Sequence, residues 1–310
     1  MWLFWRKQKK ANDDFDERGW EDPTQGTLEL THVGPYEIVA RIGAGGMGTV
    51  YKAIDRVNDR VIAIKVLNRE YDLDKKRRKR DYLGREIQIA ASLNHECIVR
   101  MHPKLMEQED TDGNIRRCLL MEFVDGHSLR KHIVERDLSI RHMIELAIKL
   151  CKGLDFLHQQ GVVHRDVKPE NFLITRDNQH VKIVDFGLSK SNASWRTRFM
   201  REGGGTRRYM SPEQLAKNAV DARSDIFSLG LTLYELFTGR HPCDGADIRE
   251  IQRQICKSSY RFDPPSKHNA QVPPALDKIL LKMLRRSLDN RYQSVTEVLM
   301  DLSRIGESRI

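Results

Sequence analysis

The stretch from residue 164 to residue 187 carries residue types that suit the transfer of a phosphoryl group. It contains the run H-R-D-V-K-P-E-N and, further on, D-F-G. Such a transfer needs a carboxylate that orients and deprotonates the attacking hydroxyl, oxygen ligands for a hard cation, and a positive charge near the phosphate. Asp166 is the candidate base, and Lys168 supplies a positive charge two residues further on. Asn171 and Asp185 carry the oxygen donors that Mg²⁺ or Mn²⁺ prefers, so we expect a metal site here.

The residues between the two motifs predict a β-hairpin. Residues 172–174 and 181–184 are short apolar runs typical of strands, and Asp177-Asn178 between them favours a turn. A hairpin of this kind would bring the two candidate metal ligands together in space.

A glycine-rich segment lies near the start of the chain, between two strand-like runs at residues 38–42 and 49–53. Gly43, Gly45 and Gly48 allow backbone N–H groups to approach phosphate oxygens with no Cβ in the way. The same G-x-G-x-x-G spacing occurs in dinucleotide-binding sites, but there a helix follows the glycines. Here a strand follows, which argues against a dinucleotide site.

A single lysine, Lys65, stands in the otherwise apolar predicted strand of residues 61–66. A charge at such a position is costly unless it is paired, so Lys65 requires a partner. The next predicted helix, roughly residues 80–93, offers Glu86. Taken alone, Glu86 could equally be an exposed helix carboxylate.

Together, H-R-D-V-K-P-E-N, D-F-G and the glycine-rich segment resemble the motifs of the eukaryotic-like (Hanks-type) serine/threonine protein kinases, and the chain is most similar to bacterial members. The lysine two positions past Asp166 is typical of the serine/threonine class. The resemblance implies an α+β, bilobal protein-kinase fold with a small antiparallel β-sheet lobe plus one helix, and a larger, mainly helical lobe. The expected parts are a flexible tail at residues 1–35, a kinase domain at 36–304 (N-lobe 36–121, hinge 122–126, C-lobe 127–304) and a C-terminal tail at 305–310.

The resemblance also assigns roles to single residues. Lys65 would hold the α- and β-phosphates of ATP, and Glu86 would hold Lys65. Asp166 would align the hydroxyl, while Lys168 steadies the group in transfer. The family's adenine pocket maps onto Ile42, Val50, Ala63, Met121, Leu173 and the backbone of Glu122 and Val124.

The region after D-F-G resembles an activation segment. Residues 188–205 show no periodicity and predict a mobile loop, which ends in S-P-E where the family usually has A-P-E. By resemblance, Thr206 touches the catalytic Asp and Lys, and Glu213 pairs with Arg291. Arg165 is the arginine that receives a phosphate in kinases regulated by loop phosphorylation. Thr197 is the favoured acceptor among four candidates, the others being Ser189, Ser191 and Ser194.

Asp225, near the start of an apolar helix predicted at residues 226–237, resembles the family residue that hydrogen-bonds the catalytic-loop backbone. A plain helix N-cap is the alternative interpretation.

Composition sets further bounds. The 310 residues are 39% apolar and 31% charged, with a net charge of +9, which suits acidic partners such as ATP. No basic motif interleaved with aromatic residues indicates nucleic acid as a partner. The five cysteines are scattered without a C-x-x-C pair, which favours a reducing, cytoplasmic compartment. No apolar run approaches the roughly 18 residues that a spanning helix requires.

Residues 1–10 combine aromatic and basic side chains in an order that could make weak peripheral contact with an anionic membrane. A disordered tail is the alternative.

The sequence therefore predicts an ATP- and Mg²⁺-dependent kinase acting on serine or threonine hydroxyls of proteins and controlled by (auto)phosphorylation of its activation loop. A pseudokinase-like scaffold that binds ATP is the alternative, favoured only by the small Ala90 in the predicted helix and by the basic activation segment. A small-molecule kinase is a second alternative, against which the long segment ending in S-P-E argues.

Overall fold

The computed structural model describes residues 30–45, 48–68, 87–103, 105–109, 113, 115–186, 207–243, 245 and 247–307. These residues form two compact units. The sheet unit lies within residues 30–92 and 100–123, and the helical unit comprises the described residues of 93–99, 124–186 and 207–307. Several predicted parts of the chain lie outside the described residues, namely Glu86, Gly187, Thr206, residues 1–29 and 308–310, and the loop at 188–205 with Ser189, Ser191, Ser194 and Thr197.

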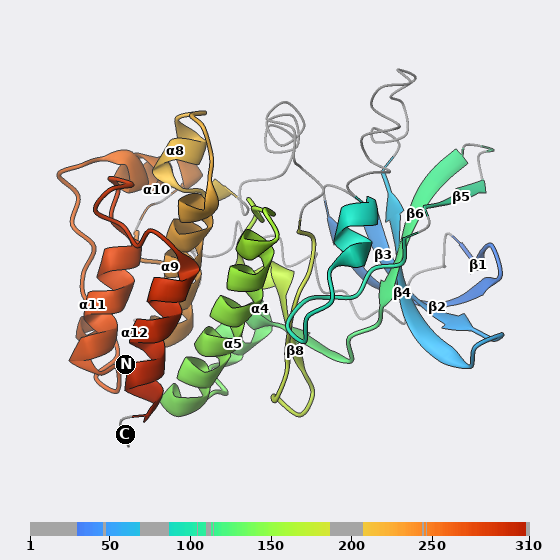
Figure 1. Cartoon of the computed structure of the whole chain (residues 1–310), viewed down its shortest axis with the longest axis horizontal. Coiled ribbons are helices and arrows are strands. Elements are labelled where there is room, and N and C mark those ends of the chain that lie inside the picture. The colour runs from blue at the N-terminus through green and yellow to red at the C-terminus, as the bar shows by residue number, and fades with distance from the viewer. Residues whose placement is uncertain are drawn as a thin grey trace, which may run out of the picture. The chain divides into compact units, whose positions relative to one another are not determined.

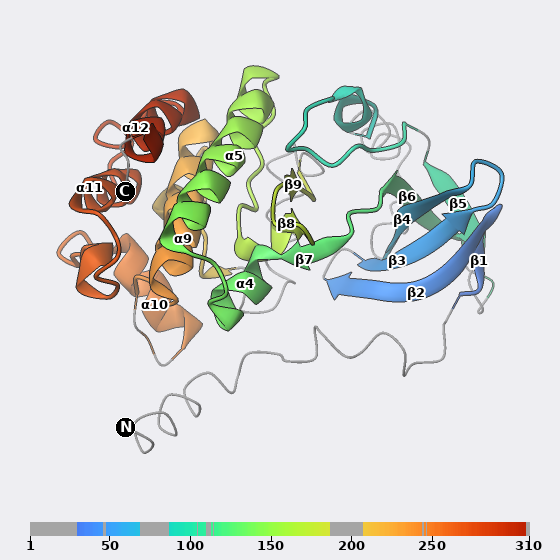
Figure 2. The same cartoon turned by 90° about the horizontal axis from the view of Figure 1, so that it is seen from below.

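The sheet unit is built on a six-stranded antiparallel sheet with the strand order β1-β2-β3-β4-β6-β5 (Figure 2). Strand β4 is buried on both faces from Ile62 onward, which explains its central place. Ile62, Ile64 and Val66 face a buried apolar cluster, and Ala63 and Lys65 between them are buried as well. Six residues at 87–92 are helical. The strands are β1 (His32–Val33), β2 (Tyr36–Gly45), β3 (Gly48–Asp55), β4 (Arg60–Leu67), β5 (Met106–Glu109) and β6 (Ile115–Glu122).

The helical unit carries a set of packed helices (Figure 1) and a small three-stranded sheet (Figure 2). The sheet, in the order β7-β8-β9, is formed by β7 (Gly126–Ser128), β8 (Phe172–Thr175) and β9 (Val181–Ile183). The helices are α4 (Leu129–Glu135), α5 (Ile140–Gln159), α8 (Pro212–Leu215), α9 (Ala222–Thr238), α10 (Ile248–Cys256), α11 (Pro274–Met283) and α12 (Val295–Glu307), with 3₁₀ turns η2 (Pro169–Asn171) and η3 (Pro265–Lys267).

Helix α9 is the central support of the helical unit. Every residue from Ser224 to Thr238 is buried, and the helix contacts α4, α5, α11 and α12. The Asp221 side chain accepts a hydrogen bond from the N–H of Arg223 and caps the helix, which ends at Gly239 in the left-handed conformation. The helix therefore begins four residues earlier than the sequence predicted.

These elements confirm the predicted α+β class, with one part an antiparallel sheet and the other mainly helical. Within the described residues, no helix has the length and apolar character needed to cross a bilayer.

Candidate active site

Two predicted catalytic residues and one predicted metal ligand come together in the helical unit. The carboxylate of Asp166 is buried, and its Oδ2 lies 3.1 Å from Nζ of Lys168. Asn171 donates from Nδ2 to the backbone oxygen of Asp166 at 2.7 Å and to its Oδ2 at 2.9 Å. The candidate base is therefore oriented by two donors from its own loop.

The predicted hairpin is confirmed, and it places both candidate metal ligands at one end. Strands β8 and β9 pair antiparallel, and beyond the last pair the N–H of Val184 donates to the backbone oxygen of Asn171 at 3.0 Å. Asp185 follows directly, in a left-handed conformation at φ 59° that Asp tolerates better than most residues. Because Nδ2 of Asn171 faces Asp166, its Oδ1 is the atom suited to a cation, and amide and carboxylate oxygens fit Mg²⁺.

Asp225 holds the backbone of the catalytic loop. Its Oδ2 accepts from the N–H of His164 at 2.7 Å and its Oδ1 from the N–H of Arg165 at 2.8 Å. The contact expected from the resemblance is therefore present. The N-cap interpretation is wrong, because Asp221 caps α9. Sequence analysis missed His158, whose Nε2 lies 2.8 Å from Oδ2 of Asp225 and fixes that carboxylate from α5.

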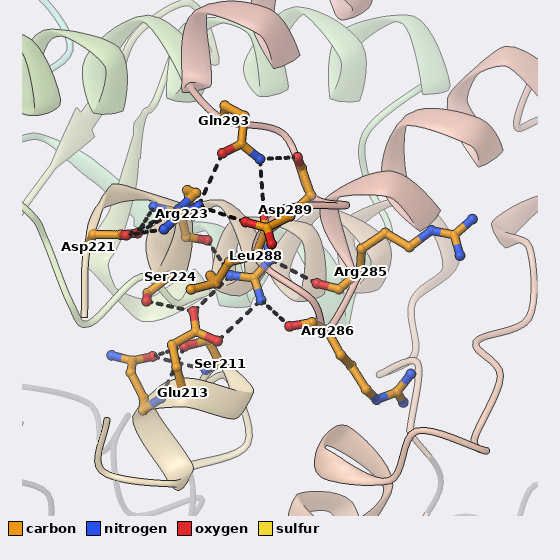
Figure 3. Close-up of polar contacts among 12 residues, drawn as sticks. Ser211, Glu213, Asp221, Arg223, Ser224, Arg285, Arg286, Leu288, Asp289 and Gln293 are labelled. Atoms are coloured by element: carbon orange, nitrogen blue, oxygen red, sulfur yellow. Dashed lines mark hydrogen bonds and ion pairs between the residues drawn. The ribbon is translucent and has the colours of Figure 1, made fainter. Parts of the chain in front are cut away.

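The expected pair of Glu213 and Arg291 is present and buried. Figure 3 labels Glu213 together with Ser224, a second partner of its carboxylate. Arg291 binds with both terminal nitrogens, at 2.8 Å and 3.2 Å, and the hydroxyl of Ser224 donates to the same carboxylate at 2.6 Å. Burial alone would raise the pKa of Glu213, but Arg291 and Ser224 together hold it below its usual value. The residue after S-P is thus anchored as a carboxylate.

A second arginine, which is partly buried, supports the loop and gave no sequence signal. Arg130 on α4 donates to Glu170 Oε1 and to Glu235 Oε1, both at 2.8 Å, and the hydroxyl of Tyr209 contacts Arg130 and Glu235. Glu170 is the residue before Asn171, so this cluster ties the catalytic loop to helix α9.

The sheet unit places its predicted nucleotide-binding residues on one face. In antiparallel strands directly opposed residues share a face. Lys65 on β4 is opposite Val50 on β3, and Ala63 is opposite Met121 on β6. Since positions 63 and 65 alternate along β4, these four side chains lie on the face away from the Ile62, Ile64 and Val66 cluster.

The glycine-rich hairpin has the expected form on either side of its tip. Gly43 is opposite Val50, and Gly45 is opposite Gly48. A Cβ on Gly48 would lie 2.1 Å from the backbone oxygen of Val66, so the backbone there approaches β4 more closely than any side chain allows.

The remaining predicted adenine contacts fall on both units. The N–H of Glu122 donates to the backbone oxygen of Arg100 at 2.9 Å. Ile42 is half-buried on β2 of the sheet unit. Val124 and the half-buried Leu173 belong to the helical unit.

Comparison with known proteins identifies the family. The chain belongs to the protein kinase family, because the family model "Protein kinase domain" matches residues 36–301. It is 39% identical over 278 residues to the serine/threonine-protein kinase PknB of Mycolicibacterium smegmatis, covering 88% of this chain and 43% of that protein. A probable serine/threonine-protein kinase of Clostridium acetobutylicum is 34% identical, covering 89% and 40%. The chain thus spans about two fifths of the length of these relatives.

Solved structures show the same fold. The kinase domain of Mycobacterium tuberculosis PknI superposes with a TM-score of 0.65 at 26% identity, covering 90% of this chain and 99% of that one. Rad53 residues 1–466, solved with AMP-PNP, gives 0.69 at 26% identity, covering 86% and 64%. The predicted resemblance to bacterial serine/threonine kinases is confirmed.

Proposed function

We propose that this chain transfers the γ-phosphoryl group of ATP to serine or threonine hydroxyls of proteins. The arrangement of Asp166, Lys168 and Asn171 beside the start of the hairpin that leads to Asp185 supports this proposal most directly. The names of the relatives, all serine/threonine-protein kinases, support the same activity and do not favour a scaffold without catalysis.

Each residue has a defined task in this proposal. Bound Mg²⁺ or Mn²⁺ would supply positive charge against the β- and γ-phosphates. Asn171 through Oδ1 and Asp185 through its carboxylate would hold that cation. Asp166 would orient the substrate hydroxyl and accept its proton, while Lys168 would stabilise the negative charge of the group in transfer.

The nucleotide would use the residues of the sheet unit. Lys65 would bind the α- and β-phosphates with Glu86 as its partner, and the backbone at Gly43, Gly45 and Gly48 would contact phosphate oxygens. The Rad53 structure with AMP-PNP, an ATP analogue, supports nucleotide binding by this fold.

The direct test incubates the protein with Mg-ATP and a generic basic protein and measures phosphate incorporation. We expect incorporation on serine or threonine that Asp166→Ala and Asp185→Asn each reduce at least about a thousandfold. Asp177→Asn makes the same chemical change on an exposed turn of the hairpin and should retain activity. If the wild type and both active-site variants bind ATP but are equally inert, the scaffold alternative replaces the proposal.

Three further proposals follow from the sequence, one on regulation and two on the organisation of the chain. Thr197 would accept a phosphate that pairs with Arg165, which phosphosite mapping and Thr197→Ala would test.

Residues 36–304 would suffice as the kinase domain, and residues 1–10 would make weak membrane contact. A chain truncated to 36–304 should keep its activity but lose co-sedimentation with anionic vesicles; unchanged co-sedimentation would dispose of the membrane contact.

A further inference from the structure

Gln214, the residue after S-P-E, reaches the catalytic loop. Its side chain lies in α8 and is 3% exposed, and its Nε2 donates to the backbone oxygen of Arg165 at 2.8 Å. Its Oε1 accepts from the N–H of Ser211 at 3.0 Å and from the Ser211 hydroxyl at 3.2 Å. Since a backbone N–H only donates, the atom facing Ser211 must be the oxygen, and Nε2 necessarily faces Arg165.

The residue that Gln214 contacts has an unfavourable backbone conformation. Arg165 has a φ of 67°, in the left-handed region that a non-glycine residue adopts only when its surroundings enforce it. Two buried side chains hold it from opposite ends. Asp225 accepts from its N–H at 2.8 Å, and Gln214 donates to its C=O, which belongs to the peptide bond leading into Asp166.

The serine of S-P-E takes part in the same arrangement. The Ser211 hydroxyl accepts from the N–H of Gln214 at 3.4 Å, while the Gln214 side chain returns to Ser211, which is a complete capping box. An alanine at this position would lose both hydroxyl contacts. Glu213, next to Gln214, is pinned by Arg291, so the anchor of the segment and the contact to the catalytic loop are adjacent residues.

We propose that Gln214 is a positioning residue for Asp166. It fixes the peptide bond that precedes the base, and Ser211 orients its amide for this task. The proposal rests on the function proposed above, because Asp166 is taken as the base. It gives the serine of S-P-E a physical role, and it makes the orientation of the base depend on the placement of α8.

The test compares steady-state kinetics of Gln214→Met and Gln214→Glu with the wild type. Met has a similar length but cannot donate, so we expect kcat to fall about tenfold while the KM for ATP stays within about twofold. Gln214→Glu keeps the acceptor for Ser211 but turns a carboxylate toward the Arg165 oxygen. Protonation restores a donor, so the kcat of this variant relative to the wild type should rise as the pH is lowered.

The control is Asn269→Leu. Asn269 also donates from a partly buried amide to a backbone oxygen, that of Phe237 at 2.8 Å, but it contacts no residue of the catalytic loop. We expect this variant to lose stability and keep its kcat.

Hydrogen exchange over residues 163–168 provides a readout that does not need activity, and we expect it to be faster in Gln214→Met than in the wild type or Asn269→Leu. A kcat within twofold of the wild type together with unchanged exchange would overturn the role of Gln214. If the wild type transfers no phosphate, the proposed function fails, and the exchange measurement alone still decides whether Gln214 holds the loop.

Discussion

Two arginines of the helical unit, the buried Arg291 and the partly buried Arg130, stabilise their surroundings in different ways. Both pair with a buried glutamate at 2.8 Å. Arg291 also donates to the backbone oxygens of Arg223, Arg285 and Arg286, three residues that are labelled in Figure 3. Arg130 instead donates to the side chains of Glu170, Glu235 and Tyr209.

The two sites differ in whether water or a neighbouring side chain can replace the hydrogen bonds of the arginine when it is removed. Backbone oxygens cannot change protonation, so each backbone partner of Arg291 would lose a buried donor with nothing to replace it. The partners of Arg130 can adapt, because Glu170 is 39% exposed and Tyr209 can still donate to Glu235. Removing Arg291 should therefore lower the free energy of unfolding more than removing Arg130. The surroundings of Arg130 should instead make stability depend on pH.

Arg291→Met should have the largest effect. It leaves the Glu213 carboxylate without its cation and removes one donor from each of three backbone oxygens, so we expect the free energy of unfolding to fall by about 3–5 kcal/mol. Urea denaturation at pH 7.5 measures it. Arg304→Met, which removes an arginine 76% exposed on α12, is the control and should change stability by less than about 0.5 kcal/mol. A loss below about 1 kcal/mol for Arg291→Met would contradict the anchor described above.

Arg130→Met should cost less, about 2–3 kcal/mol in the same measurement. Glu170 can be hydrated, and the Tyr209 hydroxyl keeps one hydrogen bond to Glu235. A loss equal to or larger than that of Arg291→Met would show that adaptable side chains offer no advantage over backbone partners.

Sequence analysis found one of these arginines and missed the other, for a physical reason. Asp166, Lys168 and Asn171 lie in one short loop, and the hairpin beside them has a local pattern, so their proximity could be predicted. The pairing of Glu213 and Arg291 spans 78 residues and came only from the family resemblance.

The Arg130 contacts could not be predicted. They span 40 and 105 residues and follow no local periodicity. His158 and Gln214 were missed for the same reason, because each contacts the loop through tertiary packing alone.

The region around Arg130 should also make stability depend on pH. Burial, followed by the nearby charge of Arg208, lowers the pKa of His241 from 6.5 to about 4, so this residue is neutral in the folded chain at pH 5. The unfolded chain binds a proton there below pH 6.5. The contribution of neutral His241 to the free energy of unfolding is therefore fully present above pH 6.5. The free energy of unfolding should fall by about 3 kcal/mol as the pH drops to 4. Urea midpoints measured from pH 7.5 to 4 should be flatter for His241→Gln than for the wild type.

Two glutamates, Glu235 beside Arg130 and Glu213 beside Arg291, should make stability fall over a second, more acidic pH range. Burial would raise the pKa of Glu235, but Arg130 and Arg208 hold it at about 2, below its usual 4.5. The stability from this pair is present above pH 4.5 and is lost as the pH falls toward 2. The pKa of Glu213, the partner of Arg291, is lowered as well. Acid below pH 4.5 therefore weakens the surroundings of both arginines, and only between pH 6.5 and 4.5 is the loss of stability specific to the surroundings of Arg130. If the urea midpoint changes equally with pH between 6.5 and 4.5 in the wild type and in His241→Gln, this pH dependence does not come from His241.

Tyr209→Phe should have the smallest effect and isolates the hydroxyl between Arg130 and Glu235. Burial is the largest cause that raises the pKa of Tyr209, so the hydroxyl is protonated and donates to the Glu235 carboxylate. The ring stays in its apolar cluster, and Arg130 still pairs with Glu235 directly, so we expect a loss of about 1–2 kcal/mol. Tyr260→Phe, in the same cluster, removes a hydroxyl that donates to the backbone oxygen of Pro242 at 3.1 Å. Since a hydrogen bond to a charged group is stronger than one to a neutral group, Tyr209→Phe should cost more, and the reverse order would mean that the Glu235 charge is satisfied by Arg130 alone.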